Sequence, residues 1–433
     1  MVAIAIDARK IRDFGIGTYI RNLVRAIARL DDENRYLLLV GAQGAEALAD
    51  LPPNFHLVSE RSRVYSIKEL FTLSWRLWRL ELDLYHATHY VLPLVLPCKA
   101  VVTIHDIIHL LYPEFLPSRL AFFYAQRMIR SSLERSSRVI SVSQTTRSDL
   151  LRLFEVDGRK IEVVYNGVDP AFHRRLAPEE LAEWQQRLGL RQPYLLFVGN
   201  PKPHKNLDNV IQAFAKARAI HAFEGELVCA GGQPEADLRT RQRAETLGVA
   251  DHVRLLGTVS DEALPAIYQG ATLFLYPTLY EGFGLPVVEA MASGVPVITS
   301  NTSALREIGE GSAQLVNPLD VEALARAIAH SMADPEHRAS LVELGRRRAR
   351  EFTWERAARR TLAIYRSVVD GTPTASLSSS GTWSMPRLNH GTEPKARAHV
   401  GEGGRDRPAA SVNAPSGEVA TLRPDARKVD KSP

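Results

Sequence analysis

The stretch that decides the fold is Glu281-Gly282-Phe283-Gly284-Leu285-Pro286-Val287-Val288-Glu289. It follows an apolar run, Leu273-Phe274-Leu275-Tyr276, which predicts a buried strand. A strand, a glycine loop and a helix in this order are typical of anion sites in α/β proteins, because glycine lets backbone N–H groups approach the anion and the helix N-terminus adds partial positive charge. Carboxylates do not bind phosphate, so we expect Glu281 and Glu289 to face hydroxyl groups or a developing positive charge.

Short apolar segments recur along the whole chain and alternate with amphipathic ones. The first series is Val2–Ile6, Tyr36–Val40, Leu84–Ala87, Ala100–Ile104 and Val139–Val142. The second series is Tyr194–Gly199, Glu226–Ala230, Val253–Leu256, Leu273–Tyr276, Val297–Thr299 and Gln314–Val316. Such strands, separated by helices, predict parallel sheets covered on both faces. We therefore predict an α/β protein with two doubly wound, Rossmann-like domains facing across a cleft.

The predicted N-terminal domain covers residues 1–185, and the predicted C-terminal domain covers residues 186–352. A charged segment with two prolines, Asn166–Gln192, is expected to connect them as a linker with a short helix. Residues 371–433 contain seven Pro, seven Gly and eight Ser with few bulky apolar residues. Such a segment cannot offset the entropy of ordering, so we predict a disordered tail.

Composition excludes several classes of protein. The net charge of +5 is too small for a general nucleic-acid binder. The two cysteines, Cys98 and Cys229, are far apart and have no metal-ligand spacing, so we predict no metal site. The chain begins without a signal-peptide pattern and has no uncharged apolar stretch of spanning length. We expect a cytoplasmic protein, with a peripheral position at the inner face of a membrane as an open alternative.

Lys205 lies in Gly199-Asn200-Pro201-Lys202-Pro203-His204-Lys205, between a strand end and a helix start. A cation there suits a diphosphate leaving group, because departure leaves negative charge on the terminal phosphate. The alternative is a solvated basic loop. Glu289 is about one turn into the helix after Gly284, where it could accept hydrogen bonds from a ribose diol, or merely complement the helix dipole. Glu281 is expected nearer a transferred sugar, or is a surface turn carboxylate.

Two further segments are predicted to face the cleft. Gly15-Ile16-Gly17 follows the first strand, and we predict a nucleotide-fold loop before a helix, or a plain tight turn. His105 follows the strand Ala100–Ile104, so it lies at a carboxyl end and could bind a sugar or an acceptor, or be a core histidine. No Asp-x-Asp occurs, although transferases that hold a diphosphate through a divalent ion usually need one. This favours stabilisation of the leaving group by protein groups.

The segment from Arg61 to Arg79 carries five basic residues among aromatic and aliphatic ones. Trp75 and Trp78 share helical spacing with Leu82. Two interpretations stay open: an interfacial patch for anionic lipid and a lipid-linked acceptor, or an ordinary amphipathic helix that packs on the sheet.

The C-terminal half of the chain resembles family-4 retaining glycosyltransferases (glycosyl transferases group 1), which have the GT-B fold. The stretch from Glu281 to Glu289 matches the E-x7-E motif of that family, and Pro296-Val297-Ile298 matches its continuation. The resemblance covers roughly residues 1–370. It implies that Lys205 contacts the diphosphate, Glu289 the ribose and Glu281 the donor sugar. The remaining implied donor residues are Val259 near the base and Gly282, Phe283, Gly284 and Leu285 around the sugar and phosphates.

The resemblance also implies that the first domain, with Gly15, Gly17 and His105, closes the cleft and binds the acceptor. A last helix, about 353–370, is expected to return to that domain. Asn200 stands where the family often has an Arg that assists the Lys, which changes how the diphosphate charge is shared.

We predict a retaining, metal-independent hexosyltransferase that uses a nucleotide sugar, GDP- or UDP-linked, and no cofactor. Mannose is favoured as the sugar, and a saccharide or lipid-linked acceptor of surface polysaccharide synthesis as the partner. The alternatives are a sugar-nucleotide epimerase or hydrolase on the same fold, and a non-catalytic sugar-nucleotide-binding scaffold.

Overall fold

The computed structural model describes residues 1–372, except residues 42–43, 61, 63, 65, 117 and 221–222. The side chains of residues 67, 68 and 234–236 are also outside the description. The predicted disordered tail therefore lies, from residue 373 onward, outside the described residues, as do three positions of the Arg61–Arg79 segment. Within the described part of the chain, no helix is long and apolar enough to cross a membrane.

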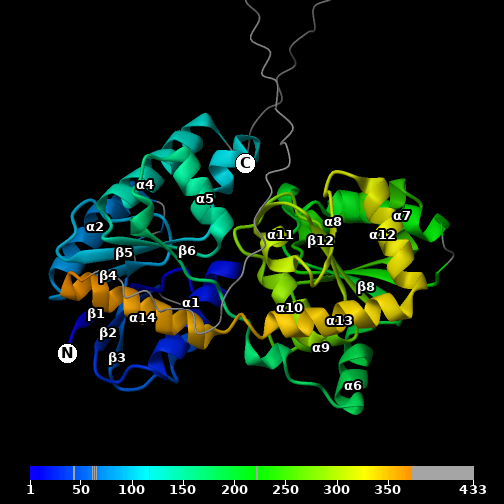
Figure 1. The fold of residues 1–433 in the computed structure, drawn as a ribbon, viewed down its shortest axis with the longest axis horizontal. Coiled ribbons are helices and arrows are strands. Elements are labelled where there is room, and N and C mark those ends of the chain that lie inside the picture. The colour runs from blue at the N-terminus through cyan, green and yellow to red at the C-terminus, as the bar shows by residue number, and fades with distance from the viewer. Residues whose placement is uncertain are drawn as a thin grey trace, which may run out of the picture. The chain divides into compact units, whose positions relative to one another are not determined.

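Two parallel sheets with covering helices form the body of the protein (Figure 1). The first sheet has the order β3-β2-β1-β4-β5-β6-β7. Its strands are β1 (Ala3–Asp7), β2 (Arg35–Val40), β3 (Phe55–Ser59), β4 (Leu84–Ala87), β5 (Lys99–Ile104), β6 (Arg138–Ser141) and β7 (Ile161–Val163). Its helices are α1 (Phe14–Ala28), α2 (Ile67–Trp78), α3 (Ile108–Leu111), α4 (Arg119–Arg135), α5 (Gln144–Leu153) and α14 (Trp354–Asp370). We call this sheet with its helices the first lobe.

The second lobe is the other sheet, of order β10-β9-β8-β11-β12-β13, with its helices. Its strands are β8 (Tyr194–Val198), β9 (Glu226–Ala230), β10 (Val253–Gly257), β11 (Leu273–Tyr276), β12 (Val297–Ser300) and β13 (Gln314–Val316). Its helices are α6 (Pro178–Leu188), α7 (Leu207–Ile220), α8 (Pro234–Thr246), α9 (Leu264–Gln269), α10 (Leu285–Ser293), α11 (Ser303–Gly309), α12 (Val321–Ala333) and α13 (Pro335–Ala349). The two parallel sheets confirm the predicted α/β class.

Short 3-10 turns complete the chain and mark several loops near strand ends. They are η1 (Glu46–Leu48), η2 (Pro113–Phe115), η3 (Gly158–Lys160), η4 (Pro170–Phe172), η5 (Pro203–Lys205) and η6 (Ala250–His252).

Two strands escaped the sequence analysis, for different reasons. β3 is an edge strand with mostly exposed or half-buried side chains, so it has no apolar run. β7 has only three residues, too few to show a period. The domain boundary that we predict after residue 185 falls within α6, and Trp184 and Leu188 of this helix pack against the core of the second lobe.

The predicted loop at Gly15-Ile16-Gly17 is wrong, because both glycines lie inside α1, which begins at Phe14. Asp13 is the extended N-cap residue, and the Gly17 N–H donates to its carbonyl over 2.6 Å. A side chain at Gly17 would collide with the Ile11 carbonyl. Close backbone approach, rather than a ligand, explains that glycine.

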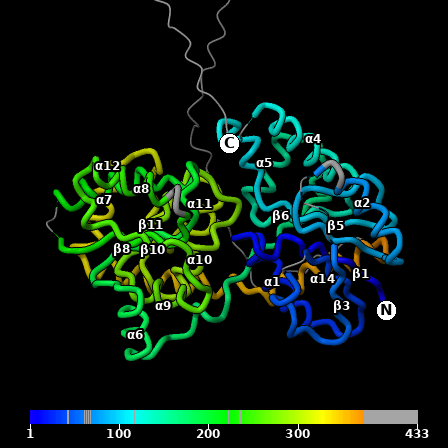
Figure 2. The backbone as a smooth tube through the Cα atoms, turned by 180° about the vertical axis from the view of Figure 1, so that it is seen from behind, coloured from blue at the N-terminus to red at the C-terminus, as the bar shows by residue number. Residues whose placement is uncertain are grey.

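The last helix, α14, packs against α1 and the first sheet (Figure 2). Its buried face includes Leu362, Tyr365 and Val368, which belong to the same apolar cluster as Ile20 and Val24 of α1. The Tyr365 hydroxyl also lies 2.5 Å from Nδ1 of His86 in β4. The chain therefore returns to the first lobe after completing the second.

We expect Leu362→Ala to lower the free energy of unfolding by about 2–5 kcal/mol, because it removes buried methyl groups at a site that is 6% exposed. Urea denaturation measures this change. Arg359→Ala on the exposed face of α14, where Glu355 is the partner of Arg359 among the described residues, should stay within about 0.5 kcal/mol. Equal unfolding midpoints for the two variants would contradict the packing of α14 described above.

Candidate functional site

A cavity of about 540 Å³ lies at the carboxyl ends of the central strands of both sheets. It is lined from the first lobe by the start of α1 and by the segment after β5, and from the second lobe by the loops after β8 and β11 and the start of α10. This is where open α/β sheets bind ligands, because helix N-termini and loop N–H groups collect there. We call this cavity the cleft.

Lys205, Glu281 and Tyr276 form a compact polar triad in the cleft. Nζ of Lys205 lies 2.6 Å from Oε1 of Glu281 and 2.9 Å from the Tyr276 hydroxyl. The Tyr276 hydroxyl also donates to the same carboxylate oxygen over 3.0 Å. Lys205 belongs to η5, Tyr276 to β11 and Glu281 to the loop after β11. The fold therefore brings a cation next to an anion that is distant from it in the sequence.

The charges of the triad support one another in a largely buried place. Burial lowers the pKa of Lys205, but the Glu281 carboxylate and Tyr276 outweigh this effect, so the pKa lies above its usual value. Lys205 is therefore a permanent cation. Burial and the Glu281 charge likewise raise the pKa of Tyr276, which keeps its hydroxyl protonated. An ammonium has three N–H donors, and two of them have partners here.

The glycine loop after β11 makes a close contact between the two lobes. A side chain at Gly282 would overlap the carbonyl oxygen of His105. The Thr146 hydroxyl of α5 lies 3.3 Å from the carbonyl oxygens of both residues. Gly284 has φ +104°, in the region that favours glycine, and serves as N-cap of α10. The N-terminus of α10 is thereby directed at the cleft, as anion binding requires.

Glu289 lies in α10 and is only 9% exposed, although it also lines the cleft. Its Oε2 accepts a hydrogen bond of 3.0 Å from the Tyr268 hydroxyl of α9. Burial raises the pKa of Glu289 to about 7, the Tyr268 hydrogen bond opposes this rise, and the charges of Asp169 and Asp261 add to it. A buried carboxylate with lone pairs to spare favours a ligand that brings hydroxyl donors.

His105 is fixed by the first lobe. Its Nε2 lies 2.9 Å from the carbonyl oxygen of Thr88, and its ring meets the Tyr19 ring edge-on at 4.8 Å between centroids. A carbonyl only accepts, so Nε2 must carry the hydrogen and a neutral ring has Nδ1 as its acceptor. Burial lowers the pKa of His105 and keeps the ring neutral, although the bond to Thr88 opposes this effect.

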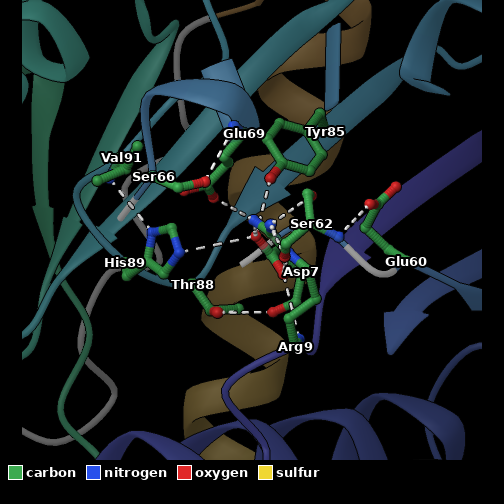
Figure 3. A network of polar contacts seen from close by, with 10 residues as sticks. All are labelled: Asp7, Arg9, Glu60, Ser62, Ser66, Glu69, Tyr85, Thr88, His89 and Val91. Atoms are coloured by element: carbon green, nitrogen blue, oxygen red, sulfur yellow. Dashed lines mark hydrogen bonds and ion pairs between the residues drawn. The ribbon is translucent and has the colours of Figure 1, made fainter. Parts of the chain in front are cut away.

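The first lobe also contains a buried network centred on Asp7 and Arg9 (Figure 3). The Arg9 guanidinium is 2.5 Å from Asp7 and 2.6 Å from Glu69 of α2. Burial would raise the pKa of Asp7, but the Arg9 charge and hydrogen bonds hold it well below its usual range. The Thr88 hydroxyl donates 2.6 Å to the Asp7 carbonyl, so the network also positions the residue that holds His105.

Among the described residues, one group has metal-ligand geometry: Asp7, Glu69 and His89, all buried. The Arg9 guanidinium bonds both carboxylates and supplies the positive charge that an ion would bring. Burial also lowers the pKa of His89 to about 4, with Asp7 opposing this shift. The group is therefore a self-contained ion-pair network.

Glu307 of α11 joins the lobes on the far side of the glycine loop. Its carboxylate accepts from the backbone N–H groups of Gln144 and Thr145, at 3.0 and 3.1 Å, and from the Tyr165 hydroxyl. A carboxylate on the first turn of α5 satisfies orphan donors and complements the helix dipole. The second lobe thus supplies a cap to a helix of the first.

The structure brings most of the predicted site residues to the cleft. These are Gly15, His105, Asn200, Lys205, Val259, Glu281, Gly282, Phe283, Gly284, Leu285 and Glu289. Gly17 is buried beside Ile11 and does not line it. Asp106, which we expect to face the cleft together with His105, also lines it. The sequence analysis missed other lining residues: Arg12, Thr18, Arg21, Asn166, Lys202, His204, Thr258, Asp261 and Tyr276. Several of these, such as Lys202, His204, Thr258 and Tyr276, had a signal, since each adjoins or belongs to a residue or motif named above.

Two family models match the chain, one over most of each lobe. The family model described as Glycosyltransferase Family 4 matches residues 15–172, and the model described as Glycosyl transferases group 1 matches residues 179–348. The chain is 29% identical over 366 residues to the O-antigen chain mannosyltransferase B of Escherichia coli, covering 81% of this chain and 96% of that protein.

Two other curated relatives match over shorter stretches. The O-antigen chain mannosyltransferase RfbU of Salmonella typhimurium is 31% identical, over 56% of this chain and 62% of its own length. The MMP alpha-(1->4)-mannosyltransferase of Mycolicibacterium hassiacum is 33% identical, over 53% of this chain and 54% of its own length.

Solved structures share the fold at low identity. HepE from Anabaena, crystallised with UDP and glucose, has a TM-score of 0.70 at 19% identity and covers 85% of this chain and 100% of its own. WaaG, described as a glycosyltransferase involved in lipopolysaccharide biosynthesis, has a TM-score of 0.69 at 16% identity and covers 83% of this chain and 99% of its own. The predicted GT-B arrangement is confirmed.

The pKa of Glu289 leads to a stability prediction. The pKa of this carboxyl is 4.5 in the unfolded chain and about 7 in the folded protein. The free energy of unfolding therefore falls by about 3 kcal/mol in total as the pH rises from the lower to the higher value. We expect Glu289→Gln to match the wild type below about pH 4.5 and to be the more stable of the two above about pH 7, in chemical denaturation. Glu262→Gln, at an exposed position, is the control. A constant difference across this range would contradict the raised pKa.

Proposed function

The chain belongs to the glycosyltransferases of group 1, and we propose that it moves a hexose from a nucleotide diphosphate sugar to a saccharide or lipid-linked acceptor. The triad of Lys205, Glu281 and Tyr276 beside the N-terminus of α10 is the observation that carries this proposal. It offers a cation and a helix terminus to a diphosphate and a carboxylate to sugar hydroxyls. Mannose is the sugar we favour, since the curated relatives described above are named mannosyltransferases.

The reaction we infer proceeds with retention and without a metal ion. The acceptor oxygen forms a bond to the anomeric carbon while the bond from that carbon to the phosphate oxygen breaks, on the same face of the sugar. The phosphate oxygen takes the acceptor proton, so atoms and charges balance without a dedicated protein base. Two N–H groups of the Lys205 ammonium have partners among the described residues, and we infer that the third donates to the phosphate, whose growing negative charge the ammonium stabilises.

The other cleft residues divide the substrate between them. Glu289 accepts from the ribose hydroxyls, which compensate its buried charge. Glu281 receives sugar hydroxyls at the lone pairs that Lys205 and Tyr276 leave open. His105, whose ring is kept neutral by burial and whose Nε2 donates to the Thr88 carbonyl, presents an acceptor nitrogen toward a hydroxyl of the sugar or acceptor. Asn200 and Val259 complete the donor side of the lining, with Val259 near the base.

We also propose a peripheral contact of the first lobe with an anionic membrane surface. Leu70, Leu73 and Leu77 form the buried face of α2, as the packing interpretation requires. Packing on the sheet does not account for three aromatic side chains on another face of α2. Phe71, Trp75 and Trp78 are 61%, 55% and 73% exposed. Exposed aromatic residues that share a helix with arginines suit the interface of an anionic bilayer.

The neighbouring loop extends this face. Val95 is 66% exposed and its N–H donates to the Ser74 hydroxyl of α2, and Leu94 is 45% exposed. The Arg79 guanidinium lies 3.9 Å from the centroid of the Trp75 ring, so charge and aromatic surface are adjacent. A lipid-linked acceptor would then approach the lobe that we assign to acceptor binding.

We expect Lys205→Ala to reduce kcat at least about a hundredfold with little change in folding, because the group that stabilises the leaving charge is lost. Turnover of GDP- and UDP-sugars, followed by release of the nucleoside diphosphate, measures this. Lys202→Ala is the matched control, since Lys202 lines the same cleft but lies outside the triad, and it should stay within about tenfold of the wild type. A Lys205→Ala variant with near-normal kcat would exclude the proposed role.

Co-sedimentation with vesicles tests the membrane contact. Trp75→Ser combined with Trp78→Ser should weaken binding to anionic vesicles at least about tenfold, because interfacial aromatic area is lost. Leu319→Ser, at a position 71% exposed on the second lobe, is the control and should bind as the wild type does. Unchanged binding of the double variant would leave α2 as a packing helix only.

A further inference from the structure

A second cavity, of about 310 Å³, lies in the second lobe and contains none of the residues that line the cleft. Its lining includes four arginines: Arg174 and Arg175 from the linker before α6, Arg346 from α13, and Arg350 at the C-cap of that helix. Glu343 is the one acidic residue in the lining. We call this cavity the arginine pocket.

The arginine pocket carries more positive charge than the protein neutralises. Arg174 pairs with Glu180 at 2.6 Å. Arg175, Arg346 and Arg350 form no ion pair with any of the described residues. Burial lowers the pKa of Arg346, and the charges of Arg175 and Arg350 lower it further while Glu343 opposes them. Like charges held this close favour a bound anion.

A buried hydroxyl gives a second, independent indication. Ser293, the last residue of α10, lines the arginine pocket and is 6% exposed. Its Oγ has no hydrogen-bond partner among the described residues. An unsatisfied buried hydroxyl costs free energy unless a ligand or water completes it. A phosphoryl oxygen would accept from this hydroxyl and from the guanidinium groups at once.

An alternative structural role accounts for one of these arginines. The Arg346 guanidinium lies against Gly294, just beyond the end of α10, where a cation complements the helix dipole. A single charge is enough for that purpose. Arg175 lies in the linker and Arg350 at the C-cap of α13, and neither is needed at the end of α10, so the excess charge at the arginine pocket remains.

The arginine pocket adjoins both places where the chain passes between the lobes. Arg175 belongs to the first passage, which Gln269 of α9 holds by accepting from Leu176 N–H and donating to the Arg174 carbonyl. Arg350 precedes the second passage, where the Val168 N–H donates 3.1 Å to the Phe352 carbonyl. An anion between Arg175 and Arg350 would therefore join the two passages.

We propose that the arginine pocket binds a small free anion bearing phosphoryl groups, of the size of pyrophosphate, and that this anion links the two passages between the lobes. Arginine suits this ligand because its planar fork donates two parallel hydrogen bonds to phosphoryl oxygens. The cavity volume lies at the lower end of the range for small-molecule sites, which fits a compact ligand. The site is separate from the proposed donor site, and its assignment does not depend on the proposed function.

Hydrogen exchange on the full chain tests this site, with inorganic pyrophosphate as the probe and sodium chloride of equal ionic strength as the reference. We expect pyrophosphate to slow exchange in residues 169–177 and 343–353 of the wild type. Arg175→Gln combined with Arg350→Gln should raise the half-protecting concentration at least about tenfold. Both positions are exposed, so the double variant should fold.

Arg347→Gln is the matched control, because Arg347 is exposed on α13 and does not line the arginine pocket. It should behave as the wild type. Ser293→Ala leaves every charge in place and should raise the half-protecting concentration at least about threefold. Three outcomes would each overturn the proposal. The first is protection confined to residues around Lys205, and the second is an equal half-protecting concentration for the wild type and the double variant. The third is protection by anionic vesicles but not by pyrophosphate.

Discussion

The close approach of the glycine loop to the carbonyl of His105 is the contact on which the site depends. At Gly282 the loop after β11 has no room for a side chain, because the backbone of the first lobe occupies that space. Thr146 and Glu307 reinforce the contact by hydrogen bonds across the lobes. Residues of two separate sheets therefore line a single cleft, in which His105 of the first lobe lies with Lys205 and Glu289 of the second.

Buried charge in this protein is compensated in two different ways. In the first lobe, the charges of Asp7, Arg9 and Glu69 compensate one another by ion pairs. Their network also positions Thr88, which holds His105 at the carboxyl end of β5. In the second lobe, Glu289 has one hydroxyl donor and a raised pKa, and Lys205 has an N–H to spare. Complete networks of this kind give stability, whereas incomplete ones are typical of places that await a ligand. The arginine pocket belongs to the second kind.

The two faces of α2 have different surroundings. Its leucines pack on the first sheet, and its exposed aromatic residues lie on the opposite side. Periodicity alone predicted the helix but could not separate packing from surface contact, since apolar residues occur all around it. Exposure of individual side chains identifies the packed face and the exposed face, because only the tertiary fold decides which face the sheet covers.

Sequence by itself determined the α/β class, most strands of both sheets, and the residues of the loop from Glu281 to Glu289, because these depend on local periodicity and on glycine at fixed places. It could not reveal edge strand β3, whose side chains are mostly exposed or half-buried, or that Gly15 and Gly17 lie in the first turn of a helix. Tertiary structure alone decided that Lys205, Tyr276 and Glu281 meet, and that arginines from the linker and from α13 share a cavity. Such pairings depend on how distant segments pack, and no local pattern encodes them.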